Sequence, residues 1–189
     1  MAGFVAVYDA CVLYPAPLRD LLIRLALTGA FRARWTSRIH DEWTRAVLRN
    51  RSDLNAQQLA RTRELMDETV PDCLVTDFEG IENSLTLPDD DDRHVLAAAI
   101  MSHAGTIVTY NLKDFPSTVL STYGITAQHP DEFIEHIFDL NPNAVIQAVR
   151  DQRASLKNPA KSVEELLDIL LQQGLASTVA NLRCSVNLL

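Results

Sequence analysis

Acidic and amide side chains stand in four separate segments of this chain. Such side chains supply the oxygen ligands that Mg2+ and Mn2+ prefer in proteins. A divalent ion held in this way lowers the pKa of a bound water molecule and can promote hydrolysis of a phosphodiester bond. The candidate ligands are Asp9, Glu42, the four consecutive aspartates 89–92, Asn111 and Asp114.

The elements that must position these residues follow from the hydrophobic patterns. Short β-branched or aromatic runs predict strands, and apolar residues that recur with helical spacing predict helices. Because strands alternate with helices, we expect an α/β fold: a three-layer α/β/α domain with a mainly parallel sheet. The expected strands are 3–8, 33–36, 73–76, 106–109 and 125–127, and the expected helices are 18–27, 37–49, 55–68 and the one that begins at Arg93.

The candidate ligands should meet at one edge of this sheet. Ligands of parallel α/β sheets bind beyond the carboxyl ends of the strands. Asp9 follows the first strand, and Asn111 and Asp114 follow the strand 106–109. The aspartate run precedes the helix that leads into that same strand, so its N-terminus is expected at the same edge. Glu42 joins them from a polar row along the helix 37–49, for which Ser37 is the expected N-cap.

The aspartate run also has a purely structural explanation. One aspartate can cap the first turn of the following helix, and others interact well with the helix dipole. Asp9, Glu42 and Asp114 can likewise be explained singly by turns and by ion pairs along a helix. Together these explanations are weaker, because several carboxylates at one edge repel one another unless a cation neutralises them.

The C-terminal part of the chain has a different pattern, with helices alone from Asn141 onward. Ser162 and Glu165 have the spacing of a capping box, which places a helix start there. An apolar stripe follows at Leu175, Val179, Leu182 and Val186. We therefore expect one domain with the α/β sheet over residues 1–139 and a helical extension over 140–189 that packs on this domain or on a partner.

Composition excludes several classes of protein. The chain has 189 residues and a formal net charge of −8, which argues against a general nucleic-acid coat but not against a nuclease whose acids hold metal ions. Its three cysteines are far apart and predict neither a disulfide framework nor a zinc site. We found no targeting signal and no run of membrane-spanning length, so we expect a cytoplasmic protein that does not associate with membranes.

Several blocks of the sequence resemble those of PIN-domain ribonucleases, and most closely the VapC-like toxins of bacterial type II toxin–antitoxin pairs. The resemblance covers about residues 4–138 and lies in the order and spacing of the blocks. The blocks are Asp9-Ala-Cys-Val-Leu after the first strand, the helix with Ser37 and Glu42, Asp92-Arg-His-Val-Leu-Ala-Ala-Ala, and Ile107-Val-Thr-Tyr-Asn-Leu-Lys-Asp-Phe-Pro.

This resemblance implies a catalytic set of Asp9, Glu42, Asp92 and Asp114. It implies metal ligation by Asp9, Asp92, Asn111 and Asp114, where Asn111 stands at a position that is often acidic and Asp114 is the next acid. Residues 89–91 are then expected to cap the helix or to surround the ligands, and His94 is given no role in proton transfer.

The implied activity is Mg2+- or Mn2+-dependent hydrolysis of RNA that leaves 5′-phosphate and 3′-hydroxyl ends. The implied partners are an RNA substrate and a cognate antitoxin, and a homodimer is expected. Arg38, Arg45 and Arg49 share the polar row of Glu42, and we expect them to contact RNA phosphates, although a solvated helix face explains them equally well.

Three alternatives remain at this stage. A PIN-like scaffold could bind nucleic acid or protein without cleaving it, and Asn111 favours this alternative. A phosphoacceptor receiver domain would need adjacent acids after the first strand, and Asp9-Ala-Cys does not supply them. A haloacid-dehalogenase-like phosphatase would need an aspartate where Cys11 stands.

Overall fold

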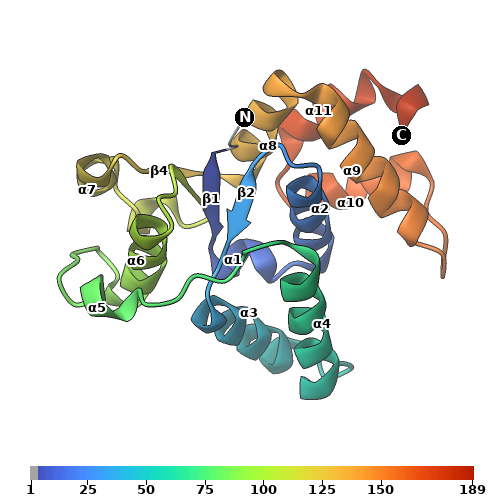
Figure 1. The fold of residues 1–189 in the computed structure, drawn as a ribbon. Helices are drawn as coiled ribbons and strands as arrows, with labels where there is room; N and C mark the ends of the chain where they lie inside the picture. The colour runs from blue at the N-terminus through green and yellow to red at the C-terminus, as the bar shows by residue number, and fades with distance from the viewer. Residues whose placement is uncertain (1–3) are drawn as a thin grey trace. The chain divides into compact units, whose positions relative to one another are not determined.

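The computed structural model describes residues 4–189 (Figure 1). Gly3, the expected first residue of the first strand, lies outside the described residues. The chain forms two compact units. Of the described residues, the first unit contains 4–14 and 31–129, and the second contains 15–30 and 130–189. These units group residues by contact, so the predicted domain boundary between residues 139 and 140 stays a prediction.

The first unit contains a four-stranded sheet with the strand order β2-β1-β3-β4. All neighbouring strands run parallel, and Tyr8 of β1 is paired with Val108 of β3. With its accompanying helices and the helical C-terminal part, this sheet confirms the predicted α/β fold class. The strands are β1 (Val5–Tyr8), β2 (Arg32–Arg34), β3 (Thr106–Val108) and β4 (Thr126–Gln128).

The predicted strand at residues 73–76 is wrong. Leu74 forms only an isolated parallel bridge with Trp35, and two hydrogen bonds from Trp35 N and Val75 N hold this contact. The strand was predicted from the β-branched pair Val75 and Thr76, which is too short to distinguish a strand from a single bridge.

Helices connect the strands of this unit. Thr36 caps α3, because its hydroxyl accepts a hydrogen bond from Ile39 N at 3.1 Å, so the expected cap at Ser37 is one residue too late. The helices are α1 (Ala10–Leu13), α3 (Ser37–Asn50), α4 (Ala56–Thr69), α5 (Glu79–Glu82), α6 (Arg93–Met101) and α7 (Ser117–Leu120), and the 3-10 turns are η1 (Asp90–Asp92), η2 (Leu112–Asp114) and η3 (Ser121–Tyr123).

The core of the first unit lies where α6 packs on β1 and β3. The side chains from His94 to Ala99 are buried, as are those of Ile107 and Val108. Three consecutive alanines on α6 combine high helix propensity with small volume, which lets the helix be buried on more than one side. The helix therefore has a fixed position under the strands that end at the candidate site.

The second unit is entirely helical. Its elements are α2 (Ala16–Leu27), α8 (Pro130–Leu140), α9 (Pro142–Ser155), α10 (Val163–Gln172), α11 (Ala176–Arg183) and the 3-10 turn η4 (Val186–Leu188). The predicted capping box of Ser162 and Glu165 is confirmed at the start of α10. Asp131 of α8 accepts hydrogen bonds from Ser177 N and Thr178 N at 2.8 and 2.9 Å and so caps the start of α11. Among residues 4–189, no helix has both the length and the apolar character needed to span a membrane.

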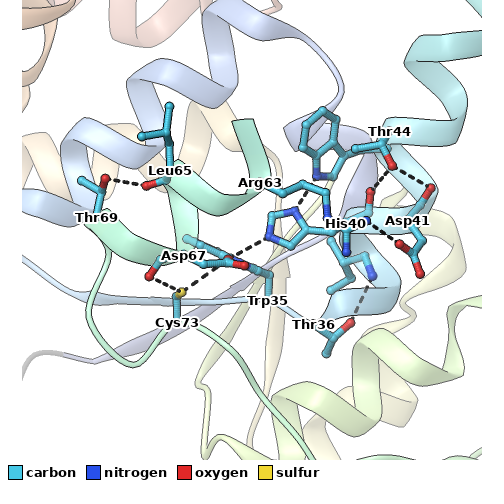
Figure 2. A network of polar contacts seen from close by, with 12 residues as sticks. Trp35, Thr36, His40, Asp41, Thr44, Arg63, Leu65, Asp67, Thr69 and Cys73 are labelled. Carbon is cyan, nitrogen blue, oxygen red and sulfur yellow. Dashed lines mark hydrogen bonds and ion pairs between the residues drawn. The ribbon is translucent and has the colours of Figure 1, made fainter. Parts of the chain in front are cut away.

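A buried hydrogen-bond network joins α3 to α4 in the first unit (Figure 2). Asp67 accepts from Trp35 Nε1 at 2.8 Å and pairs with His40 Nε2 at 2.9 Å. Trp43 Nε1 donates to His40 Nδ1 at 2.9 Å, so His40 is neutral and carries its proton on Nε2. Burial also lowers the pKa of His40, which favours this neutral form. Asp67 is therefore the acceptor that satisfies two buried ring donors at once.

We predict that Asp67→Ala lowers the free energy of unfolding by about 2–4 kcal/mol, because it leaves the Trp35 and His40 donors without a partner. Denaturant unfolding of both proteins measures the difference. Asp53→Ala is the matched control, since Asp53 pairs with Arg51 at the protein surface and should unfold like the wild type. Equal stability of the Asp67 and Asp53 variants would show that the network contributes nothing.

Candidate functional site

Asp9 lies at the carboxyl end of β1, where a hydrogen bond ties it to the end of β3. Thr109 Oγ1 donates to Asp9 Oδ2 at 2.7 Å, and Cys11 Sγ donates to the same oxygen at 3.1 Å. The other carboxylate oxygen accepts from Ala10 N at 2.6 Å and caps α1. Asp9 is only 4% exposed. Its carboxylate is thus fixed by the ends of two neighbouring strands.

Glu42 reaches the same edge from the middle of α3. Its Oε1 lies 2.9 Å from Nε2 of His94, which is 1% exposed, and 3.7 Å from Nε of Arg38. The other ring nitrogen of His94 is buried without a hydrogen-bond partner among the described residues. His94 Nε2 is therefore the buried group that sets the position of the Glu42 carboxylate. Sequence reasoning gave His94 no proton-transfer role, and it did not identify this contact.

The aspartate run divides into capping and non-capping members. Asp89 caps the turn η1, because its side chain accepts a hydrogen bond from Asp91 N at 2.9 Å. Asp92 is the last residue before α6, and its side chain makes no capping hydrogen bond. Half-burial and then the negative charges of Asp9, Asp89 and Asp114 raise the pKa of Asp92 to about 7. One aspartate of the run is therefore a cap, while Asp92 lies among other carboxylates.

Asp9, Glu42 and Asp92 line one pocket of about 430 Å3 within the first unit. Asn111 belongs to its wall, whereas Asp114 does not, although Asp114 is close enough to raise the pKa of Asp92. The pocket is lined by Asp9, Ala10, Cys11, Tyr14, Glu42, Trp43, Ala46, Asn50, Asp92 and Asn111. The structure thus brings Asp9, Glu42, Asp92 and Asn111 together and places Asp114 beside them.

The wall along α3 contains residues that sequence reasoning missed. Glu42, Ala46 and Asn50 follow each other at intervals of four, which puts them on one face of the helix. Asn50 Nδ2 donates to the hydroxyl of Tyr14 at 3.2 Å, so a hydrogen bond joins these two residues of the pocket wall. Asn50 lies eight residues after Glu42, and this spacing in the sequence could have predicted that it shares the helix face of Glu42.

The arginines of α3 lie outside this wall. Arg38 forms an ion pair with Glu82 at 2.7 Å in addition to its longer contact with Glu42. Arg45 and Arg49 are exposed and are not part of the pocket wall. Their expected contact with RNA phosphates stays a prediction.

The chemistry of the pocket suits a hard divalent cation. Three carboxylates and the amide of Asn111 supply oxygen donors, and the pKa of Asp92 is raised first by half-burial and then by the negative charges of its neighbours. Within residues 4–189, however, no three acidic, histidine or cysteine side chains stand close enough together to hold a metal ion as they are. The donor types therefore fit Mg2+ or Mn2+, and metal binding itself is a proposal.

Replacing Asp92 by Asn tests this electrostatic description. Because the folded-state pKa of about 7 exceeds the ordinary value of an aspartate, ionisation of Asp92 destabilises the folded state increasingly as the pH rises toward 7. Asp92→Asn removes that charge and keeps the shape. In chelator at pH 8 the variant should melt at or above the wild-type temperature, and the difference should shrink as the pH falls to 5. A variant that melts lower at both pH values would show that Asp92 acts as a structural residue.

Comparison with known proteins gives three findings. The family model described as "PIN domain" matches residues 5–113, and the model described as "VapC50 C-terminal domain" matches residues 130–184. A protein of Mycobacterium tuberculosis with the name "Putative ribonuclease VapC50" is 42% identical over 82 residues.

That alignment covers 43% of this chain and 48% of the relative, so it spans about half of the length of the curated protein. No solved structure gave a significant match. The first model alone spans more than half of the chain, and its match ends just beyond Asn111. Together with the parallel sheet and the acidic pocket at its edge, this match shows that the chain belongs to the PIN-domain family.

Proposed function

We propose that this protein is a metal-dependent ribonuclease that hydrolyses RNA phosphodiester bonds and acts as the toxin of a VapC-like toxin–antitoxin pair. The observation that carries the proposal is the convergence of Asp9, Glu42, Asp92 and Asn111 on one pocket at the carboxyl edge of a parallel sheet. The family membership and the printed name of the M. tuberculosis relative support the same activity.

The proposed mechanism assigns a separate task to each side chain. Asp9 and Asp92 would hold Mg2+ or Mn2+ together with the oxygens of Asn111 and Asp114. The ion, when bound, would supply Lewis acidity and a water molecule of lowered pKa. Asp9 is preorganised for this task by Thr109 and Cys11. Glu42, which His94 holds in place, would orient the water or the phosphate.

The proposed partners follow from the family and from the pocket. An RNA strand would place a phosphate over the acids, and a cognate antitoxin would cover the same pocket to suppress the activity. A homodimer, a cytoplasmic location and contacts of the α3 arginines with RNA phosphates stay predictions.

Cleavage of an end-labelled RNA pool of random sequence tests the proposal. We expect the wild-type protein to cleave in Mg2+ or Mn2+ and not in chelator. Asp9→Asn and Asp92→Asn should each lose at least ~100-fold in rate, because each removes a negatively charged ligand that would hold the ion, whose positive charge would stabilise the transition state. Asp53→Asn, which removes an exposed carboxylate outside the pocket, is the control. Binding of RNA without metal-dependent cleavage would favour the non-catalytic scaffold instead.

His94 should act as a positioning residue for Glu42. We predict that His94→Leu lowers the cleavage rate by about 10–100-fold, as loss of a group that orients a ligand does. His94→Gln can place an N–H donor near the position of Nε2 and should recover most of the rate. Melting curves of both variants separate this effect from a loss of folding. If the two variants lose activity equally while remaining folded, the contact of His94 with Glu42 is not what sets the rate.

A further inference from the structure

The helical unit contains a cavity that the proposed nuclease mechanism does not use. Its volume is about 700 Å3, larger than that of the acidic pocket, which is about 430 Å3. Small-molecule sites in proteins occupy this size range and combine apolar walls with a few polar groups. The apolar part of its wall includes Pro17, Leu156, Pro159, Leu166 and Ile169. The cavity is therefore large enough for a ligand of the size of a nucleotide.

Gln152 of α9 lines this cavity and has an unsatisfied acceptor. The residue is 2% exposed, and its Nε2 donates to the carbonyl of Pro17 at 2.8 Å. Its Oε1 is buried and has no hydrogen-bond partner within residues 4–189. Exchanging the two amide atoms does not remove the problem, because Oε1 would then face the Pro17 carbonyl. Buried polar atoms of this kind are rare, and this one belongs to a residue of the cavity wall.

The cavity is also positively charged in an otherwise acidic chain. The sequence has three lysines, and two of them, Lys157 and Lys161, line this cavity. Lys161 lies 3.5 Å from Glu165, and the one acidic residue of the wall, Asp20, is paired with Arg24 at 2.8 Å. Lys157 has no ion-pair partner among the residues that the structure describes. The charge left for a ligand is therefore positive, which selects an anion.

We propose that this cavity is a binding site for a nucleoside monophosphate. An N–H group of the base donates to Gln152 Oε1, and the apolar wall covers the ring. The phosphate pairs with Lys157 and Lys161. All four bases carry an N–H donor, so the acceptor at Gln152 does not fix which base the site takes. The site belongs to the helical unit and does not depend on whether the acidic pocket cleaves RNA.

Isothermal titration of the full-length protein with AMP, GMP, CMP and UMP tests the site. Chelator is present throughout, so that no metal ion can draw the nucleotides to the acidic pocket. At least one nucleotide should bind with a Kd below about 1 mM. Lys157→Glu should weaken that binding by about 10-fold or more, because it reverses a charge at the phosphate. Lys113→Glu makes the same change at the one lysine outside the cavity and should bind within about twofold of the wild type.

Two further measurements test the contact with the base. Ribose 5-phosphate lacks the base and should bind at least about 10-fold more weakly than the best nucleotide. Gln152→Met keeps the approximate length of the side chain and removes the acceptor, and it should lose this preference. The proposal is wrong if no nucleotide binds, if Lys157→Glu binds like Lys113→Glu, or if ribose 5-phosphate binds as tightly as the nucleotides. The ribose 5-phosphate comparison needs no variant, so it decides even if Gln152→Met does not fold.

Discussion

The parallel pairing of β1 with both β2 and β3 is the constraint on which the candidate site depends. Because the three strands run in the same direction, their carboxyl ends lie at one edge. Asp9 and Asn111 follow two of these ends, and the residues after β2 lead directly into α3. The 2.7 Å hydrogen bond from Thr109 to Asp9 then joins the ends of β1 and β3. An antiparallel β3 would place Asn111 at the opposite edge and dismantle the pocket.

Helix α3 connects this edge to the rest of the first unit. One of its faces contacts α4, and the other lines the pocket. His40 and Glu42 are two residues apart, and on a helix such residues point in nearly opposite directions. His40 faces α4, where both of its ring nitrogens have partners. Glu42 faces the pocket and pairs with His94, whose second ring nitrogen has no hydrogen-bond partner within residues 4–189. His40 therefore fixes α3 against α4, and His94 sets the position of the Glu42 side chain.

The sequence was informative where a residue's position depends on the direction of a strand or on local capping. Asp9 and Asp92 could be placed at the sheet edge because each adjoins an element of clear periodicity, and the capping box at Ser162 depends on two residues only. The choice between Asn111 and Asp114 could not be made, because the turn η2 rotates successive side chains away from one another. The contact between His94 and Glu42 joins helices far apart in sequence, so only packing reveals it. The predicted strand at residues 73–76 was wrong for another reason, because its β-branched pair is too short to distinguish a strand from the single bridge at Leu74.

The net charge of the whole sequence does not describe the charges at the two pockets. A value of −8 describes neither environment that matters. In the first unit, half-burial and the neighbouring carboxylates together raise the pKa of Asp92 to about 7, so negative charge is concentrated at that pocket. In the helical unit, Asp20 of the cavity wall is paired with Arg24, and Lys157 of the same wall has no ion-pair partner among the described residues, so a positive charge remains for an anion. Binding energy depends on the charges within about a Debye length of the ligand rather than on their sum over the chain. An acidic protein can therefore carry one site for a metal ion and another for a phosphate without contradiction, provided that each site controls its own ion pairs.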